Sequence, residues 1–365
     1  MMMNALLAIA LSASAAAGTW EHHRGGNDQH GRCSGAVPAT LERSWKVETG
    51  SAIRSTPVLD SKTVYFGTTD GAVLALDRAS GAQRWSTSLK EPVEAPLTLD
   101  GTGAYIGDTS GALHRLESST GQVTWTFKTE AKILGAPAIA GPLVLIGSYD
   151  RNLYGVRKTD GKEAWRYATE HHLHASPSVT EEGALVGGCD GDLHIVEVDS
   201  GKLKKRITIG AQVGTSAAVA EGEAYVGHHG GGLVAVDLRA GEVAWKSQVS
   251  RQPIVSSPAV SGSRVFFGSR DRHLRAVDRA TGEVAWKFRT GGRIDTAPVT
   301  CDGKVVTGSK GGRISVLSAD KGEVLGSHDL GSPITAGPVV SAGQIFVGTA
   351  DGALHCMTAK QGRGK

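Results

Sequence analysis

The 365-residue sequence lacks the features that mark several common protein classes. Its cysteines are few and far apart and form no C-x-x-C pair, which argues against a zinc ribbon or a thioredoxin-type site. The even count allows two disulfides, but the sequence leaves open the pairing among Cys33, Cys189, Cys301 and Cys356. The formal net charge is only +3, and basic residues are interspersed with acidic ones, so no nucleic-acid-binding surface is expected.

Long apolar segments are missing beyond the N-terminus. Residues 1–18 (MMMNALLAIALSASAAAG) combine an apolar core with small residues that suit signal-peptidase cleavage, although no Lys or Arg precedes the core. The core is too short to cross a bilayer, and no transmembrane segment is predicted elsewhere. We therefore expect an export signal and a periplasmic or secreted protein. Cys33 follows His30-Gly31-Arg32, which is unlike a lipoprotein processing site, so no lipid anchor is expected.

Helical and catalytic patterns are absent as well. No long apolar stripe recurs with the period of an amphipathic helix, and 50 glycines indicate a chain rich in turns. Neither G-x-S-x-G nor H-E-x-x-H occurs, and no catalytic residues are predicted.

What the sequence does contain is a repeat, first seen in residues 67–85 (GTTDGAVLALDRASGAQRW). The dipeptide Asp70-Gly71 is typical of a hairpin turn, and an apolar run of strand composition follows it. A turn glycine recurs every 40 or 41 residues, at Gly81, Gly121, Gly161, Gly201, Gly241, Gly282, Gly322 and Gly362. Because each unit has room for four short strands, this period predicts an all-β fold, an eight-bladed β-propeller of four-stranded antiparallel blades. In the first unit we expect strands at 55–59, 63–68, 72–77 and 83–88.

The two ends of the repeat array complete each other. Residues 44–47 match only the last strand of a unit, whereas the eighth unit supplies the first three strands and then stops. We therefore predict that the strand around Trp45 pairs with the strand near Leu354 and closes the ring. The expected organisation is an export signal (1–18), an N-terminal extension (19–43), one propeller (44–362) and a short tail (363–365).

Three columns of the repeat predict packing. Proline recurs in the first strand of seven units, which marks that strand as an edge beside the central channel. Tryptophan recurs in the last strand of six units, which predicts packing between blades, aided by strand glycines that let a backbone approach closely; Lys205 and Gly326 replace the indole in the other two, and we expect weak seams there. A third column holds His114, His194 and His355, which lie in different blades and so cannot converge on one metal ion at about 2 Å. We expect these histidines to pack between blades.

One face of the ring is the predicted binding surface, because loops from every blade surround the channel mouth there. The residues that precede the first strands, nearest the axis, are Arg54, Glu94, Leu134, His174, Gly214, Val255, Asp295 and Thr335. Several loop residues are basic or histidine, which suits an anionic ligand or an acidic peptide, although a charged rim in contact with solvent is the alternative interpretation. The candidate binding residues are Arg54, Lys132, His172, His174, His228, His229, Arg251, Arg270, Arg272, Arg293 and Lys310. A metal site among these histidines would lack a carboxylate or cysteine to complete it, and none is predicted.

Ahead of the repeats, residues 20–33 (WEHHRGGNDQHGRC) are polar and rich in glycine and histidine. This composition predicts a loop with solvated histidines.

Residues 75–85, 235–245 and 276–286 resemble A-x-D-x-x-T-G-x-x-x-W, the tryptophan-docking motif of the PQQ-type β-propellers. That family includes quinoprotein dehydrogenases and BamB-like envelope scaffolds, and the resemblance covers residues 45–362. Even residues 20–31 are similar to a W-x-x-x-R-G-x-N-x-x-x-G leader of such propellers, matched by Trp20, Arg24, Gly25, Asn27 and Gly31.

The resemblance implies two kinds of function. Quinoprotein dehydrogenases carry long insertions and adjacent cysteines at the quinone, and both are missing here. We therefore expect an exported, non-enzymatic, monomeric scaffold that binds a protein or peptide partner and needs no cofactor. The alternatives are an oxidoreductase that uses PQQ and calcium, and a ligand- or metal-binding propeller.

Overall fold

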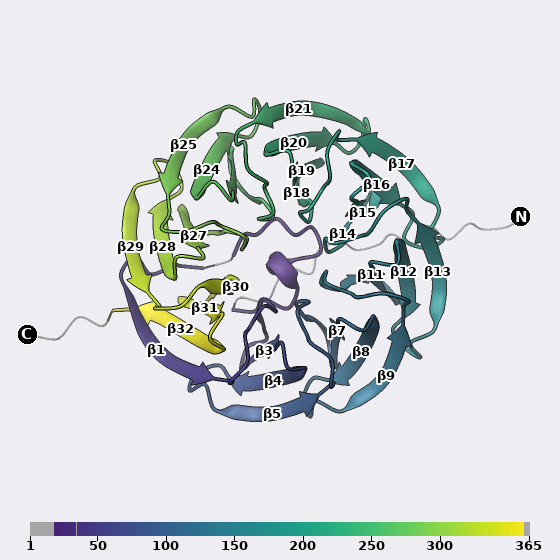
Figure 1. Cartoon of the computed structure of the whole chain (residues 1–365), viewed down its shortest axis with the longest axis horizontal. Coiled ribbons are helices and arrows are strands. Elements are labelled where there is room, and N and C mark those ends of the chain that lie inside the picture. The colour runs from purple at the N-terminus through teal and green to yellow at the C-terminus, as the bar shows by residue number, and fades with distance from the viewer. Residues whose placement is uncertain (1–17, 34, 361–365) are drawn as a thin grey trace, which may run out of the picture.

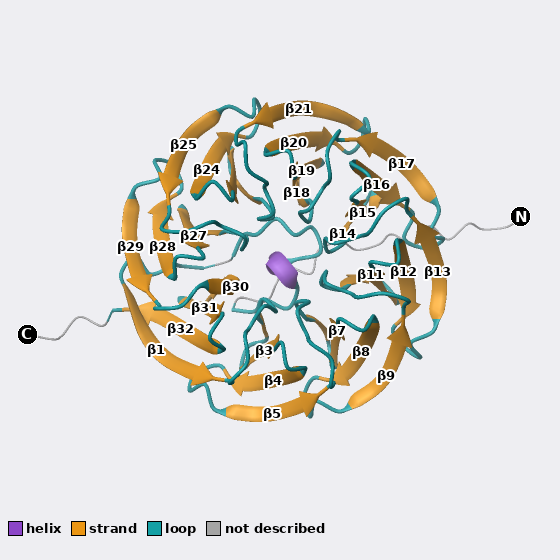
Figure 2. Ribbon diagram, viewed as in Figure 1, coloured by secondary structure: helices purple, strands orange, loops and turns teal. Residues whose placement is uncertain are grey.

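The computed structural model describes residues 18–33 and 35–360. The chain forms eight four-stranded antiparallel sheets arranged as blades around a central axis (Figure 1), which confirms the predicted eight-bladed β-propeller. Besides strands, the described residues contain a short 3-10 helix, η1 (His23–Gly25), which lies at the centre of the ring (Figure 2). The predicted export signal, apart from Gly18, and the predicted tail lie outside the described residues. Within the described part of the chain, no helix is long and apolar enough to cross a membrane.

Each blade is a meander whose first strand lies nearest the axis. Blades 1 to 4 consist of β2 (Val58–Leu59), β3 (Thr63–Gly67), β4 (Ala72–Asp77) and β5 (Gln83–Ser88); β6 (Thr98–Asp100), β7 (Gly103–Gly107), β8 (Ala112–Glu117) and β9 (Val123–Lys128); β10 (Ala138–Ala140), β11 (Leu143–Gly147), β12 (Asn152–Arg157) and β13 (Glu163–Ala168); and β14 (Ser178–Thr180), β15 (Gly183–Gly187), β16 (Asp192–Val196) and β17 (Leu203–Thr208). Blades 5 to 8 consist of β18 (Ala218–Ala220), β19 (Glu223–Gly227), β20 (Gly232–Asp237) and β21 (Glu242–Gln248); β22 (Ala259–Ser261), β23 (Arg264–Gly268), β24 (His273–Asp278) and β25 (Val284–Arg289); β26 (Val299–Cys301), β27 (Lys304–Gly308), β28 (Arg313–Ser318) and β29 (Val324–Asp329); and β30 (Ile334–Ser341), β31 (Gln344–Thr349), β32 (Ala353–Ala359) and β1 (Leu41–Glu48).

The strands of the first blade follow the predicted ones closely. The third and fourth predicted strands coincide with β4 and β5. The first is shorter than the predicted 55–59, since β2 starts only after Pro57, whose ring leaves no N–H for pairing. The strand β3 is buried along its whole length, and β4 is buried except at its two half-buried ends. The outermost strand β5 has only exposed and half-buried residues.

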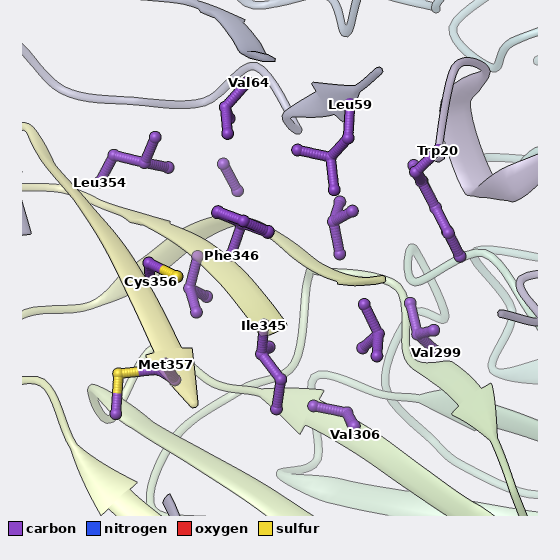
Figure 3. Close-up of a cluster of buried hydrophobic side chains, with 14 of the residues drawn as sticks. Trp20, Leu59, Val64, Val299, Val306, Ile345, Phe346, Leu354, Cys356 and Met357 are labelled. Carbon is purple, nitrogen blue, oxygen red and sulfur yellow. The ribbon is translucent and has the colours of Figure 1, made fainter. Parts of the chain in front are cut away.

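The ring is closed as the repeat ends predict. The N-terminal strand β1 pairs antiparallel with β32, with Val47 opposite Leu354 and Trp45 opposite Cys356. It begins at Leu41, ahead of the expected start at residue 44. Figure 3 shows the apolar cluster at this closure, which joins blades 7, 8 and 1; it includes Trp20, Leu59, Val64, Val299, Ile345, Phe346 and Leu354. The pairing covers the outer side of β32, so blade 8 is completed to four strands like the other seven.

The tryptophan column lies at the seams between blades, as predicted. Each indole N–H donates a hydrogen bond to a carbonyl oxygen of the next blade; the pairs are Trp45 to Arg78, Trp85 to Ser118, Trp125 to Lys158, Trp165 to Val198, Trp245 to Arg279 and Trp286 to Ala319. The strand glycines were expected to let a neighbouring backbone approach, but they make room for a side chain instead. A Cβ at Gly67 would lie 2.2 Å from the Val93 side chain, so this glycine makes room for an aliphatic side chain of the next blade.

Candidate functional site

The segment of residues 18–33, which we call the N-terminal strap, lies in the central channel (Figure 1). Its carbonyl oxygens accept hydrogen bonds from backbone amides of the innermost strands in six blades. The donor and acceptor pairs, at 2.8 to 2.9 Å, are Leu59 to Trp20, Leu99 to Glu21, Val179 to Asn27, Val219 to Asp28, Val260 to His30 and Thr300 to Gly31. Because the innermost strand of a blade is an edge, the strap satisfies amides that would otherwise face the channel unpaired.

The prediction of a loop is confirmed for this segment apart from η1, but the prediction of solvated histidines is wrong, because all three are half-buried. Burial lowers the pKa of His22, and it lowers that of His23 to about 3, so both rings are neutral at pH 7. His30 Nδ1 lies 2.6 Å from a carboxylate oxygen of Asp28. Polar composition was misleading because the inner blade edges offer backbone donors that a polar segment can satisfy. Two sequence features indicated that this segment could pair with the blades: the proline column, which marks the innermost strands as edges, and the leader motif.

Arg24 lies at the centre of the strap and is only 3% exposed. Its guanidinium donates hydrogen bonds to the carbonyl oxygens of Gln29, Pro258 and Pro298, from the strap and from blades 6 and 7. Burial lowers its pKa to about 9, so it remains a cation at neutral pH. In the described part of the chain, no carboxylate forms an ion pair with this guanidinium.

A disulfide between Cys33 and Cys301 fastens the end of the strap to blade 7. Cys189 and Cys356 are free thiols. The sequence left this pairing open, since the nearness of residues 33 and 301 depends on the path of the strap through the channel.

Above the strap lies a cavity of about 200 Å³, which we call the axial pocket. All eight residues that precede the first strands line it, from Arg54 round to Thr335, so the predicted location of this ring is confirmed. Trp20, His23 and Arg24 of the strap also line the pocket, and sequence reasoning did not include them. The channel therefore ends in a pocket built by all blades and the strap.

Basic side chains from blades 1, 6 and 7 gather at the mouth of the axial pocket. Arg270 and Arg293 pair with Asp295 at 2.9 and 3.3 Å. Arg54 pairs with Glu94 at 2.8 Å. Burial and the nearby arginines lower the pKa of half-buried Lys310, whereas Asp295 opposes that shift. These candidates are brought together as one cluster with more cations than carboxylates.

A second group of predicted residues surrounds Tyr149, which follows β11. Its hydroxyl lies 2.6 Å from His174 Nδ1, the ring of His172 stacks on it with centroids 5.1 Å apart, and Lys132 Nζ lies 4.4 Å from its ring centroid. Burial in the pocket wall, with His229 and Lys132 nearby, lowers the pKa of His174. This side of the mouth therefore offers aromatic and neutral imidazole surface.

The remaining candidates lie less centrally. A Cβ at Gly214 would be 2.6 Å from His229 Nε2, so His229 covers the ring at blade 5. His228 is half-buried and accepts a hydrogen bond from Gly230 N–H at 3.1 Å within its own turn. Arg251 and Arg272 are exposed. Among the described residues, these histidines do not bring three ligand atoms close enough together to hold a metal ion.

The histidine column does more than pack between blades. His114 and His194 each bond a carboxylate in the turn of their own blade, Asp108 and Asp190, at 2.9 Å. His355 is fully buried, and neither ring nitrogen has a hydrogen-bond partner among residues 18–33 and 35–360. The predicted role of packing between blades did not include these bonds. They form within one blade, between a histidine and a carboxylate four to six positions before it.

One group of potential metal ligands occurs among the described residues, namely Asp190, Asp192 and His194. Asp190 is bonded to His194, and Asp192 forms an ion pair with Arg206. Both carboxylates are thus already engaged within blade 4.

Comparison with known proteins places this ring in context. A family model described as outer membrane protein assembly factor BamB matches residues 31–103, 70–220 and 210–363. Comparison with curated protein sequences gave no match.

Solved structures match the fold closely. BamB from Moraxella catarrhalis superposes with a TM-score of 0.78 at 20% identity, covering 89% of this chain and all of the other. The quinohemoprotein alcohol dehydrogenase from Comamonas testosteroni gives a TM-score of 0.83 at 14% identity, covering 97% of this chain and 82% of the other. The computationally designed protein Ika8 gives 0.76 at 17% identity, covering 85% and 96%. At these identities the likeness shows a shared fold alone.

Proposed function

The chain belongs to the family of the outer membrane protein assembly factor BamB, and from this we propose that it is a non-enzymatic scaffold that binds a protein or peptide partner outside the cytoplasm. The observation that carries the proposal is how much of this chain, and of the BamB structure, the matches cover. The family model extends over nearly the whole ring, and the BamB structure is covered to 100% of its length, so both chains are built of similarly compact blades. Such a protein offers its partner the loops around the channel mouth.

The composition of that face supports protein binding. It joins a cationic cluster around Asp295 to an aromatic group around Tyr149, and arginine and tyrosine are enriched where protein interfaces are strongest. These side chains stand on short turns of a rigid ring, so little conformational entropy is lost when a partner docks. The excess of cations favours an acidic partner surface and faster association with it.

An oxidoreductase that uses PQQ and calcium is the alternative, favoured by the likeness to quinohemoprotein dehydrogenases. Calcium takes six to eight oxygen ligands, several of them carboxylates. The carboxylates that line the axial pocket, Glu94 and Asp295, are each paired with arginine, and Arg24 adds an uncompensated positive charge. The pocket therefore does not fit a calcium ion.

Location outside the cytoplasm is part of the proposal. The disulfide between Cys33 and Cys301 is of a kind that persists in oxidising compartments. The export signal expected at residues 1–18 agrees with this, and mass spectrometry of the protein from an envelope fraction would reveal whether it is removed.

Site-specific photo-crosslinking tests the scaffold function. A photoreactive phenylalanine analogue replaces exposed Arg272 on the face, or exposed Arg289 on the outermost strand β25 as the matched control. In an envelope extract, we expect one dominant covalent adduct from the face position, lost when Arg270→Gln and Arg293→Gln are added. Equal adducts from both positions would contradict a face-specific partner. Stoichiometric binding of added PQQ and calcium with dye reduction would instead favour the enzyme.

A further inference from the structure

The floor of the axial pocket holds polar groups with unused hydrogen-bonding capacity. Trp20 is 2% exposed, and its indole Nε1 has no partner among the described residues. His23 Nδ1 is likewise unpartnered. Arg24 donates to three carbonyl oxygens, although a guanidinium carries five N–H groups. Buried groups of this kind ordinarily find a partner, so their convergence at one cavity calls for one.

The charge around this floor favours an anion. The carboxylates of the pocket, Glu94 and Asp295, are neutralised by Arg54 and by Arg270 with Arg293. Burial lowers the pKa of His23 and of His174, so these two rings are neutral at pH 7. Arg24, which lines the pocket, and Lys310, which lies beside Asp295 at its mouth, form no ion pair in the described part of the chain, so positive charge is in excess around the pocket.

The size of the cavity limits what enters. Its volume of about 200 Å³ is below the roughly 300–1,000 Å³ typical of sites for small molecules and cofactors. A single carboxylate on a short aliphatic stem fits within such a space. The mouth opens among the loops of the candidate face, where a peptide could remain in contact while one side chain enters.

We propose that the axial pocket binds a carboxylate carried by a peptide, so that an acidic side chain of the partner inserts along the ring axis toward Arg24 and Trp20. This assignment rests on the proposed function and names the chemistry that the partner presents. A carboxylate accepts hydrogen bonds from guanidinium and indole donors, and these charge-assisted bonds are stronger than neutral ones. The rim cations would attract the peptide, and the floor would select the acid.

Nuclear magnetic resonance of the indole N–H groups tests the insertion directly. The protein has 7 tryptophans, and six of them donate to a carbonyl oxygen at a seam, so only the Trp20 signal reports on the pocket. On titration with a hexaglutamate peptide, we expect the Trp20 indole proton to move downfield as it gains a hydrogen bond to a charged acceptor, while the six other indole signals stay in place. A Trp20→Phe variant assigns the signal.

Affinity measurements with matched variants complete the test. We expect Arg54→Gln to weaken hexaglutamate binding about 5- to 10-fold because Glu94 loses its partner, while Arg289→Gln on β25 leaves it unchanged. A glycine–serine hexapeptide should not bind. Binding of succinate as tight as that of hexaglutamate would overturn the assignment to a peptide carboxylate.

The two proposals fail in different ways. If hexaglutamate binds and the rim variants weaken it, but the Trp20 signal does not move, the pocket assignment is wrong and face binding survives. If the Trp20 signal moves but no envelope protein crosslinks to the face, the pocket assignment survives and the scaffold function does not.

Discussion

Lys205 Nζ donates a hydrogen bond to the carbonyl oxygen of Arg239 at 2.6 Å and a longer one to that of Leu238 at 3.3 Å, across the seam between blades 4 and 5. At the previous seam, the Trp165 indole donates to the carbonyl oxygen of Val198 at 2.8 Å, and Val198 occupies the place in blade 4 that Leu238 occupies in blade 5. The lysine therefore keeps the hydrogen bond of the tryptophan column but not its ring. The methylenes of Lys205 lie over Gly241, where a Cβ would come within 2.5 Å of them.

Lys205→Trp should stabilise the propeller. The indole would cover the space above Gly241 and restore the seam found in six other blades, and we expect a gain of about 1 kcal/mol in the free energy of unfolding. Urea denaturation measures it. The reciprocal Trp165→Lys should cost about 2 kcal/mol, less than loss of a fully buried tryptophan, because a lysine stem still packs there. An unchanged or lower stability of Lys205→Trp would contradict the seam model.

The same substitution at the other exceptional seam should have the opposite effect. A Cβ at Gly326 would lie 1.7 Å from the carbonyl oxygen of Ala39, which shows that the chain entering β1 occupies the tryptophan position. Gly326→Trp should therefore destabilise by about 3 kcal/mol or more through overpacking, with Gly326→Ala also destabilising. Thermal unfolding beside Lys205→Trp provides the comparison. Stabilisation by Gly326→Trp would mean that this seam is open.

Removal of the N-terminal segment tests ring closure. A chain that lacks residues 19–50 loses β1 and the strap, so β32 becomes an exposed edge and the inner strands lose their acceptors. We expect a cooperative loss of stability across the ring, seen as a lower melting temperature in one transition. A chain that lacks only residues 19–33 retains β1 and should be affected less. Unchanged melting of the longer deletion would refute closure by β1.

The repeat predicts the ring because its information is local and periodic. Turn glycines at fixed spacing mark each blade, and the incomplete units at both ends identify β1 as the closing strand. The ring of residues from Arg54 to Thr335 was also predictable, since every blade places that position at the same distance from the axis.

The strap could not be predicted in the same way because it belongs to no repeat. Its residues are polar, and its fold depends on acceptors and donors that exist only after eight blades have assembled. The burial of Arg24, the disulfide of Cys33 and the floor of the axial pocket all follow from its path. The rim pairs, such as Arg270 with Asp295, likewise require the spatial approach of two loops.

The disulfide between Cys33 and Cys301 should contribute measurably to stability. Replacing both cysteines by serine removes the covalent link between the strap end and β26 but leaves their backbone hydrogen bonds, and we expect a loss of about 2–4 kcal/mol in the free energy of unfolding. Cys189→Ser should change little because that thiol is unpaired and only half-buried. A thiol assay on the unfolded wild type should detect two free thiols without reductant. Four would contradict the bond.

His355 should make the protein sensitive to mild acid. It is fully buried without a hydrogen-bond partner, and burial, with Lys46 and Arg43 nearby, lowers its pKa from 6.5 to about 4, although Asp351 opposes the shift. Between pH 4 and pH 6.5 this histidine binds a proton in the unfolded chain but not in the folded ring. The stability that neutral His355 contributes is therefore present above pH 6.5 and is lost as the pH falls toward 4. His355→Leu, which copies Leu74 at the equivalent place in blade 1, should leave unfolding at pH 7.5 nearly unchanged and stabilise by about 2 kcal/mol at pH 4.5 relative to wild type.

His114→Leu is the contrasting variant. It removes the histidine partner of the buried Asp108 carboxylate and should destabilise at both pH values. Equal pH dependence in wild type and His355→Leu would show that this histidine is not the acid-sensitive group.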